Sequence, residues 1–291
     1  MKAYLFTGQG SQYIGMSQKL VDTYPQAHEF FELANNILGY DILDLILNGS
    51  EEDIKRTEYS QPAVFLHSVV TAKVINDFKP EMVAGHSLGE LSALVAARVL
   101  SFGDGVKLVD VRARAMQEAC DAIDSTMAAV MGGEDEMIEE VCKEAKGIVV
   151  PANYNMPGQL VISGTREAIK EVEPILIERG ARRLIELKVA GAFHSPLMQL
   201  AREKFAQAVA ETTFKAPVCP VYQNVSAKGE TEPELIRQNI IEQLTSPVYW
   251  SQSIKQMHQD GAQEFIEIGP KSVLSNMVNK ILDRQMASAL Q

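Results

Sequence analysis

A serine between two glycines, at the junction of an apolar run and a helical run, most constrains how this chain can fold. The run Met82-Val83-Ala84 leads into Gly85-His86-Ser87-Leu88-Gly89, and helix-forming residues follow to Ala97. This order predicts a strand, a sharp turn and a helix, the G-x-S-x-G nucleophile elbow that exposes a serine hydroxyl at the top of a sheet. The backbone N–H of Leu88 would be free at the helix N-terminus and could donate to an oxyanion. An ordinary strand-to-helix turn is the alternative.

The composition is that of a globular protein and excludes several classes of function. The chain has 291 residues, of which 46% are hydrophobic and 22% charged, which is enough for a sizeable core. The net charge of −11 argues against a nucleic-acid partner, since phosphate binding needs a surplus of Lys and Arg. The three cysteines have no paired spacing, so we expect neither a metal site nor a disulfide framework.

No stretch of the sequence predicts an association with a membrane. The N-terminal apolar run, residues 3–6, is too short for a signal peptide, and no run reaches the roughly 18 apolar residues of a membrane span. We therefore expect a cytoplasmic protein.

The segment from residue 124 to residue 188 has its own order of elements. Apolar runs and helical runs alternate as β-α-β-β-α-β, which is typical of the split, ferredoxin-like unit. The strands are predicted over residues 126–131, 148–153, 160–164 and 183–187, and the helices over 135–146 and 165–179. We predict an α/β protein in which the main domain, residues 1–123 and 189–291, carries this unit as an insert. Strands of the main sheet are expected over residues 3–6, 217–225 and 264–268.

A serine nucleophile needs a base to take its proton, and five histidines are the candidates. His194 has the best context, because Gly191, Ser195 and Pro196 suit a fixed, partly exposed loop between the insert and the main domain. A capping or packing role is the alternative for it. The other four are expected on the surface, in the core or turned away from the serine: His28, His258, His67 and His86.

Two further features indicate a pocket near the serine. The loop Gly8-Gln9-Gly10 follows the first strand, and its glycines suggest unusual backbone angles or close approach to a ligand, although a plain connection would also fit. Arg112 and Arg114 share one predicted helix, where residues two apart point in different directions. At most one of them can therefore serve a given pocket, and solvated arginine is the alternative for either.

Six short motifs stand in order along nearly the whole chain. They are residues 7–12 (TGQGSQ), 85–90 (GHSLGE), 111–117 around Arg112 (VRARAMQ), 155–159 (NMPGQ), 191–195 (GAFHS) and 267–270 (EIGP). Together they resemble the malonyl-CoA:acyl carrier protein transacylases, in the stand-alone form of type II fatty acid synthesis. The resemblance implies an α/β-hydrolase-like core with a ferredoxin-like insert. It also implies a CoA thioester substrate and no cofactor.

The resemblance further implies a ping-pong reaction between malonyl-CoA and holo-acyl carrier protein. Ser87 attacks the malonyl thioester with His194 as base, and the phosphopantetheine thiol of the carrier protein then removes the malonyl group from the serine. The oxyanion donors of the family fall on the backbone N–H groups of Gln9 and Leu88. The group that orients the base falls on the backbone carbonyl of Gln243.

By the same resemblance, Arg112 pairs with the malonate carboxylate, a task for which its planar guanidinium is suited. Phe193 would disfavour an α-methyl branch, and Asn155 would line the cleft, unless it is only a turn residue. The enzyme is expected to be a monomer. Because the carrier protein and this chain are both acidic, docking would need a local basic patch, for which Arg182, Arg183 and Lys188 are candidates.

Two other functions remain open from the sequence. A serine esterase or thioesterase could use the same elbow, with water in place of the thiol resolving the acyl-enzyme. A non-catalytic binding module predicts missing catalytic residues, and none of the expected ones is missing.

Overall fold

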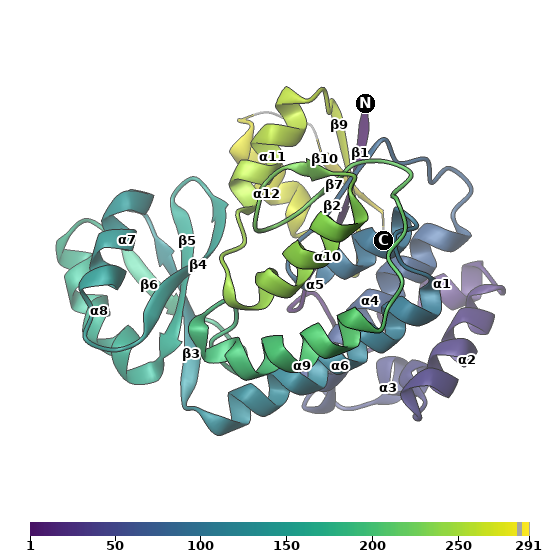
Figure 1. Ribbon diagram of the computed structural model, residues 1–291, viewed down its shortest axis with the longest axis horizontal. Helices are drawn as coiled ribbons and strands as arrows, with labels where there is room; N and C mark the ends of the chain where they lie inside the picture. The colour runs from purple at the N-terminus through teal and green to yellow at the C-terminus, as the bar shows by residue number, and fades with distance from the viewer. Residues whose placement is uncertain (284–286, 291) are drawn as a thin grey trace.

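The computed structural model describes residues 1–283 and 287–290 of the chain. Within these residues a six-stranded sheet has the order β10-β9-β1-β2-β7-β8 and a four-stranded sheet has the order β4-β5-β3-β6. The four-stranded sheet and its two helices stand apart at one end of the molecule, at the left of Figure 1. The mixed α/β architecture predicted from the sequence is confirmed.

The larger sheet is mostly parallel and is centred on β1 (Lys2–Phe6). This strand lies between β2 (Met82–Gly85) and β9 (Glu264–Ile268), parallel to both. The outer strands are β10 (Ala287–Leu290), β7 (Val221–Tyr222) and β8 (Gly229–Glu230), of which only β8 is antiparallel to its neighbour in the described residues.

Two of these outer strands differ from the sequence prediction. The strand expected over residues 217–225 pairs only at Val221 and Tyr222, because Pro217 and Pro220 have no N–H to donate to a ladder. β10 follows the last helix and was not predicted.

Both faces of the larger sheet are buried, and alternate residues of β1 serve the two faces. Ala3 and Leu5 belong to one hydrophobic cluster, with α11 and α12, whereas Tyr4 and Phe6 belong to another, with α4, α5 and α6. The covering helices are α11 (Trp250–Gln259), α12 (Leu274–Ile281), α4 (Thr57–Val74), α5 (Leu88–Ala96) and α6 (Phe102–Ala122).

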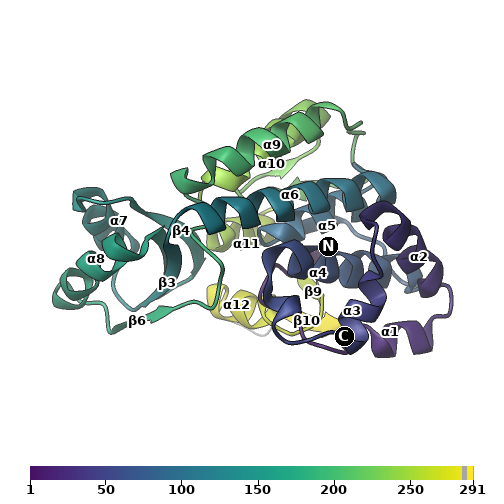
Figure 2. The same ribbon diagram turned by 90° about the horizontal axis from the view of Figure 1, so that it is seen from below.

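The remaining helices of the main domain pack on α4 and α6 or on the helices that cover these two. In Figure 2, α9 and α10 lie along one side of α6, and α1, α2 and α3 lie at the end far from the insert. Their bounds are α1 (Gln18–Thr23), α2 (Ala27–Leu38), α3 (Ile42–Asn48), α9 (Gln199–Ala210) and α10 (Pro233–Glu242), and short 3₁₀ helices occupy Asp53–Lys55, Pro196–Met198 and Gln243–Thr245. Across residues 1–283 and 287–290, no helix combines the length and apolar character needed to cross a membrane.

In the smaller sheet every pair of neighbouring strands is antiparallel. One face packs on its two helices, and the other joins the core of the main domain through residues such as Ala129 and Val161. Its elements are β3 (Ser125–Met131), α7 (Asp135–Glu144), β4 (Val149–Met156), β5 (Gln159–Thr165), α8 (Arg166–Glu178) and β6 (Arg183–Glu186). The turn between β4 and β5 consists of Pro157 and Gly158, with Gly158 at φ 74°. Asn155 therefore lies in β4 and is not a turn residue.

Candidate active site

The candidate residues gather where parallel strands of the larger sheet end. Gly8 and Gln9 follow β1, Ser87 follows β2, and Asn224 follows β7. Because parallel neighbours end at one edge, loops far apart in sequence meet there, and open α/β sheets bind their ligands at this edge. The arrangement therefore places the predicted elbow at the usual ligand-binding edge of such a sheet.

Ser87 occupies a sharp turn between β2 and α5, as the G-x-S-x-G pattern predicted. Its φ of 52° and ψ of −109° are strained for a residue with a side chain, a condition common at nucleophile elbows. A Cβ on Gly85 would collide with the backbone of Gly89, and one on Gly89 would collide with the carbonyl of Phe6. Both glycines are therefore needed for the close approach of strand and helix.

Ser87 and His194 are in direct contact, and the geometry fixes the tautomer of the ring. Ser87 Oγ lies 2.7 Å from His194 Nε2, and His194 Nδ1 lies 2.8 Å from the Gln243 carbonyl oxygen. Since a carbonyl only accepts, Nδ1 carries the proton and Nε2 offers its lone pair to the serine hydroxyl. Burial, together with the charge of Arg112, lowers the pKa of His194 to about 3. The ring is therefore a neutral acceptor at neutral pH.

The loop that carries His194 is buried, whereas the sequence suggested partial exposure. His194 is 2% exposed and has φ 57°. Two serines of the insert hold the loop: Ser125 Oγ accepts from the Ala192 N–H at 3.1 Å, and Ser163 Oγ donates to the Phe193 carbonyl at 2.6 Å. The insert covers the loop, which the local sequence could not reveal.

Arg112 is a buried cation beside the serine. It is 1% exposed and donates to Ser87 Oγ at 3.2 Å, to Gln61 Oε1 at 2.7 Å and to Gln243 Oε1 at 2.9 Å. Burial lowers its pKa to about 10, so it remains charged at neutral pH. Within the described residues its Nε has no hydrogen-bond partner. Arg114, two residues on, is half-exposed and pairs with Asp110 at 2.9 Å, so the two arginines do point in different directions.

In the part of the chain that the structure describes, the hydrogen-bond partners of Arg112 are neutral, and the charge of the buried Glu90 acts on it without a direct contact. None of the ion pairs found there includes it. A buried guanidinium held only by amides and a hydroxyl is suited to receive an anionic group of a ligand, because buried charges are stable when paired.

The two backbone N–H groups expected to bind an oxyanion belong to loops that meet at the elbow. Leu88 is the first residue of α5, so its N–H has no carbonyl to bind within the helix. A Cβ on Gly8 would approach within 2.5 Å of the His86 carbonyl oxygen, and Gly10 has φ 102°. The Gln9 side chain accepts from Gln61 Nε2 and donates to Thr57 Oγ1, each at 3.3 Å. The Gln9 loop thus passes directly against the elbow.

The other predicted residues lie around this centre. Asn155 Oδ1 is 2.9 Å from His86 Nε2, and the His86 ring lies 5.4 Å from that of Trp250, so His86 is engaged away from the serine as expected. Phe193 is buried in the core next to His194. His67 is buried with its Nδ1 3.2 Å from Ser17 Oγ, which fits the predicted packing role.

Three contacts of the site were not predicted. They are the amides of Gln61 and Asn224 and the side chain of Gln243, which joins Arg112 to the elbow by donating to the Ser87 carbonyl at 3.0 Å. A weak signal existed for two of them: Gln61 stands just before Pro62 and the apolar run of its helix, and Asn224 follows a strand at the edge where ligands bind.

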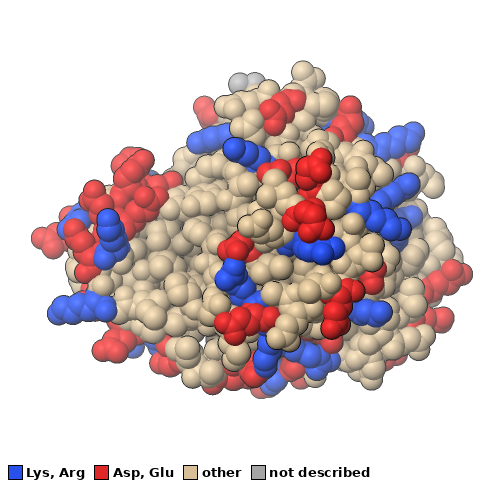
Figure 3. Space-filling model, in the orientation of Figure 1, with Lys and Arg blue, Asp and Glu red and all other residues tan. Residues whose placement is uncertain are grey.

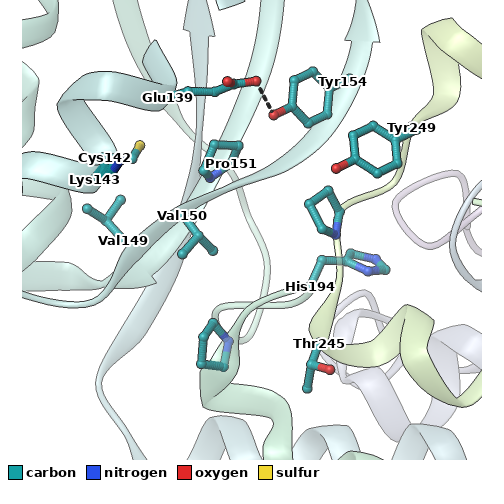
Figure 4. Close-up of a pocket in the computed structure, with 12 residues that line it drawn as sticks. Glu139, Cys142, Lys143, Val149, Val150, Pro151, Tyr154, His194, Thr245 and Tyr249 are labelled. Carbon is teal, nitrogen blue, oxygen red and sulfur yellow. Dashed lines mark hydrogen bonds between the residues drawn. The ribbon is translucent and has the colours of Figure 1, made fainter. Parts of the chain in front are cut away.

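Two cavities lie between the insert and the main domain. One, of about 580 Å³, is lined by the loop of residues 7–13, by His86 and Asn155, and by residues 187–189 and 271–277 among others. The second, of about 560 Å³, borders His194 and Thr245 and is flanked by the stacked rings of Tyr154 and Tyr249, whose centroids are 5.1 Å apart (Figure 4). Figure 3 shows few charged side chains over the junction itself and a gathering of Asp and Glu at the outer end of the insert.

Comparisons with known proteins identify the relatives of this chain. Residues 3–290 match the family described as "Acyl transferase domain". The malonyl CoA-acyl carrier protein transacylase of Escherichia coli (strain K12) is 40% identical over 293 residues, covering 99% of this chain and 95% of that protein.

Solved structures of other proteins also resemble this chain. An acyl carrier protein S-malonyltransferase from Vibrio cholerae has a TM-score of 0.95 at 38% identity, covering 99% of this chain and 96% of the other. A malonyl-transacylase solved with its type II PKS acyl-carrier protein has a TM-score of 0.95 at 36% identity, covering 99% and 95%. The chain therefore belongs to the acyl transferase domain family, among the malonyl CoA-acyl carrier protein transacylases, as its motifs had predicted.

Proposed function

We propose that this chain transfers the malonyl group of malonyl-CoA to the phosphopantetheine thiol of holo-acyl carrier protein, supplying extender units for fatty acid synthesis. One observation carries the proposal: a buried arginine without a carboxylate partner in the described residues stands 3.2 Å from the hydroxyl of an elbow serine. A nucleophile beside an unpaired buried cation suits an acyl group that ends in a carboxylate.

In the first half-reaction, His194 Nε2 takes the hydroxyl proton as Ser87 Oγ attacks the thioester carbonyl carbon. The carbonyl oxygen becomes an oxyanion, which the N–H groups of Gln9 and Leu88 stabilise. The C–S bond then breaks and leaves a malonyl ester on Ser87. The departing CoA sulfur takes the proton from the imidazolium and leaves as CoA thiol. The Gln243 carbonyl holds the ring in the required tautomer without adding a second negative charge.

The second half-reaction reverses these roles with a different thiol. His194 takes the proton of the phosphopantetheine thiol, whose sulfur attacks the malonyl ester. The oxyanion forms in the same place, the ester C–O bond breaks, and the imidazolium returns its proton to Ser87 Oγ. No cofactor is required, because the thioester itself is the activated acyl donor.

Arg112 is proposed to select the acyl group. A malonyl carboxylate would accept charge-assisted hydrogen bonds from its guanidinium, whereas an acetyl group would leave the buried cation without a partner. Phe193 is proposed to add bulk that disfavours an α-methyl branch. Asn155, on the wall of the 580 Å³ cavity, is proposed to contact the substrate.

We assign the two bodies of the fold as an α/β-hydrolase-like core, residues 1–123 and 189–291, and a ferredoxin-like insert, residues 124–188. The strand order β4-β5-β3-β6 with antiparallel neighbours supports the second assignment, since the split β-α-β-β-α-β unit pairs its strands in this way. The elbow after a parallel strand supports the first.

The carrier protein is proposed to dock near the junction of the two bodies. Arg182, Arg183 and Lys188 are exposed beside or on β6, and Lys188 also borders the 580 Å³ cavity. Like charge on the outer end of the insert would repel an acidic carrier there. We propose that the enzyme acts as a monomer in the cytoplasm and binds no nucleic acid.

The test of this function is the fate of the acyl-enzyme. The protein is mixed with malonyl-CoA and its intact mass is followed, first alone and then after addition of holo-acyl carrier protein. A malonyl adduct that persists until the carrier protein is added, and then moves to it, is the expected result. Rapid release of free malonate without the carrier would favour the serine esterase instead and would overturn the proposal.

A further inference from the structure

Asn224 hydrogen-bonds to the backbone of the elbow, although the proposed reaction assigns it no role. Its Oδ1 accepts the Ser87 N–H at 2.8 Å, and its Nδ2 donates to the Gly85 carbonyl at 2.7 Å. One amide therefore closes both sides of the turn, on either side of His86. We propose that Asn224 is a positioning residue that holds the strained turn of Ser87, an inference that rests on Ser87 being the nucleophile.

The strain of the turn explains why a positioning residue is needed there; we call the Asn224 side chain the clamp. Ser87 has φ 52°, and backbone strain of this kind costs about 1–3 kcal/mol and persists only where the surroundings determine it. Without Asn224, the partly buried Ser87 N–H would lose its partner, and the buried Gly85 carbonyl would lose the Asn224 amide. The turn would then relax towards ordinary angles, and Ser87 Oγ would shift with it.

Asn224 is itself fixed by its own backbone. Its N–H donates to Glu90 Oε2 at 2.6 Å, and its carbonyl accepts from the Tyr249 N–H at 2.9 Å. Glu90 is fully buried on α5, the helix that Ser87 precedes, and also accepts from Gln223 Nε2 at 3.1 Å. The clamp is thus anchored to the helix that follows the elbow and to the segment before α11.

Asn224 also connects the serine to the histidine. Gln243 Nε2 donates to Asn224 Oδ1 at 3.2 Å and to the Ser87 carbonyl at 3.0 Å, while the Gln243 carbonyl holds His194. Loss of the Asn224 amide would therefore disturb both ends of the Ser87–His194 contact. A misplacement of about 1 Å in such a pair can cost about 10²-fold in rate.

The test compares Asn224→Ala with Asn239→Ala. Asn239 is a matched control, because it is also buried and donates to Gln223 Oε1 at 2.9 Å but does not touch the elbow. The rate constant of Ser87 acylation by malonyl-CoA is measured by rapid quench and intact mass. The dissociation constant of malonyl-CoA is measured in a Ser87→Ala background. We expect Asn224→Ala to lower the acylation rate constant about 10²-fold and to change the dissociation constant by less than about threefold. Asn239→Ala should leave both constants as they are in the wild type.

Asn224→Asp serves where the alanine variant does not fold. It keeps the size of the side chain and the acceptor for the Ser87 N–H, but it cannot donate to the Gly85 carbonyl as a carboxylate. A loss of at least about tenfold in acylation is expected for it. Acylation at the wild-type rate in a folded Asn224 variant would overturn the inference. An equal loss in Asn239→Ala, or a loss confined to the dissociation constant, would overturn it as well.

A reagent that needs no malonyl chemistry separates this inference from the proposed function. Phenylmethanesulfonyl fluoride sulfonylates activated serines, and its rate at Ser87 is followed by mass in the same variants. If the wild type reacts with the reagent but never accepts malonyl, the proposed function fails. The clamp then stands if Asn224→Ala slows sulfonylation and Asn239→Ala does not, and it falls if both react like the wild type.

Discussion

Replacing Arg112 with alanine should remove the preference for malonyl over acetyl groups while leaving an acylatable serine. Arg112 is fully buried, and its described partners, Gln61, Gln243 and Ser87, are neutral groups. The alanine variant therefore breaks no direct ion pair of the described residues, although it removes a positive charge that acts on the buried carboxyl group of Glu90. What it removes is the partner for the carboxylate of the bound malonyl group.

The size of the effect follows from the burial of the site. Removing one partner of a buried ion pair costs about 3–5 kcal/mol, because the other charge is left unpaired. At about 1.4 kcal/mol per tenfold, the ratio of malonyl to acetyl acylation rates should fall by about 10²- to 10⁴-fold. Arg112→Lys should lie between wild type and alanine, since an ammonium keeps the charge but not the planar fork.

The assay measures acylation of Ser87 by malonyl-CoA and by acetyl-CoA, each as a second-order rate constant from intact mass. Arg114→Ala is the matched control, because Arg114 lies on the same helix, is half-exposed and pairs with Asp110. Its ratio should equal that of the wild type. The reasoning is refuted if Arg112→Ala still acylates Ser87 with an unchanged malonyl-to-acetyl ratio.

Three more predictions concern the base, the pH profile and the elbow. His194→Ala should slow acylation by several orders of magnitude, on the order of 10³-fold or more, because base and nucleophile act as a unit; near-wild-type rates in a quench experiment would exclude it as the base. The pKa of His194 is lowered to about 3 by burial, so the ring stays neutral well below pH 6.5; acylation should retain most of its rate at pH 5, and a midpoint near 6.5 in the pH–rate profile would contradict this. Gly85→Ala should lower the free energy of unfolding in denaturant by about 3 kcal/mol or more through overpacking, since the new Cβ meets the backbone of Gly89. Gly103→Ala is the control and should keep its stability, because its Cβ would meet only Ile37 Cδ1, at 3.7 Å. Equal stability of the two variants would argue against the steric role of Gly85.

The elbow could be predicted because its determinants are local. Gly85, Ser87 and Gly89 lie within one turn of chain, and their spacing alone implies the close passage of strand and helix that the structure contains. Arg112 and Arg114 were separated by helical geometry without knowledge of their surroundings.

The contacts between distant segments could not be derived from spacing. His194 meets the Gln243 carbonyl across 49 residues, and only the resemblance to known transacylases suggested that pair. Asn224 reaches the site because β7 pairs with β2, and Gln61 reaches it because α4 packs against α5 and α6. Both placements follow from the topology of the fold. The burial of His194 was missed because the serines that hold its loop belong to the insert.

The central claim is that Ser87 holds a malonyl group, with its carboxylate on Arg112, until a thiol removes it. A crystal structure tests this claim most directly, determined from crystals of the protein that are soaked with malonyl-CoA in the absence of carrier protein. The account predicts an ester on Ser87 Oγ, its carbonyl oxygen facing the N–H groups of Gln9 and Leu88, and its carboxylate paired with the Arg112 guanidinium. An acyl group on another residue, or a malonyl carboxylate directed away from Arg112, would contradict it.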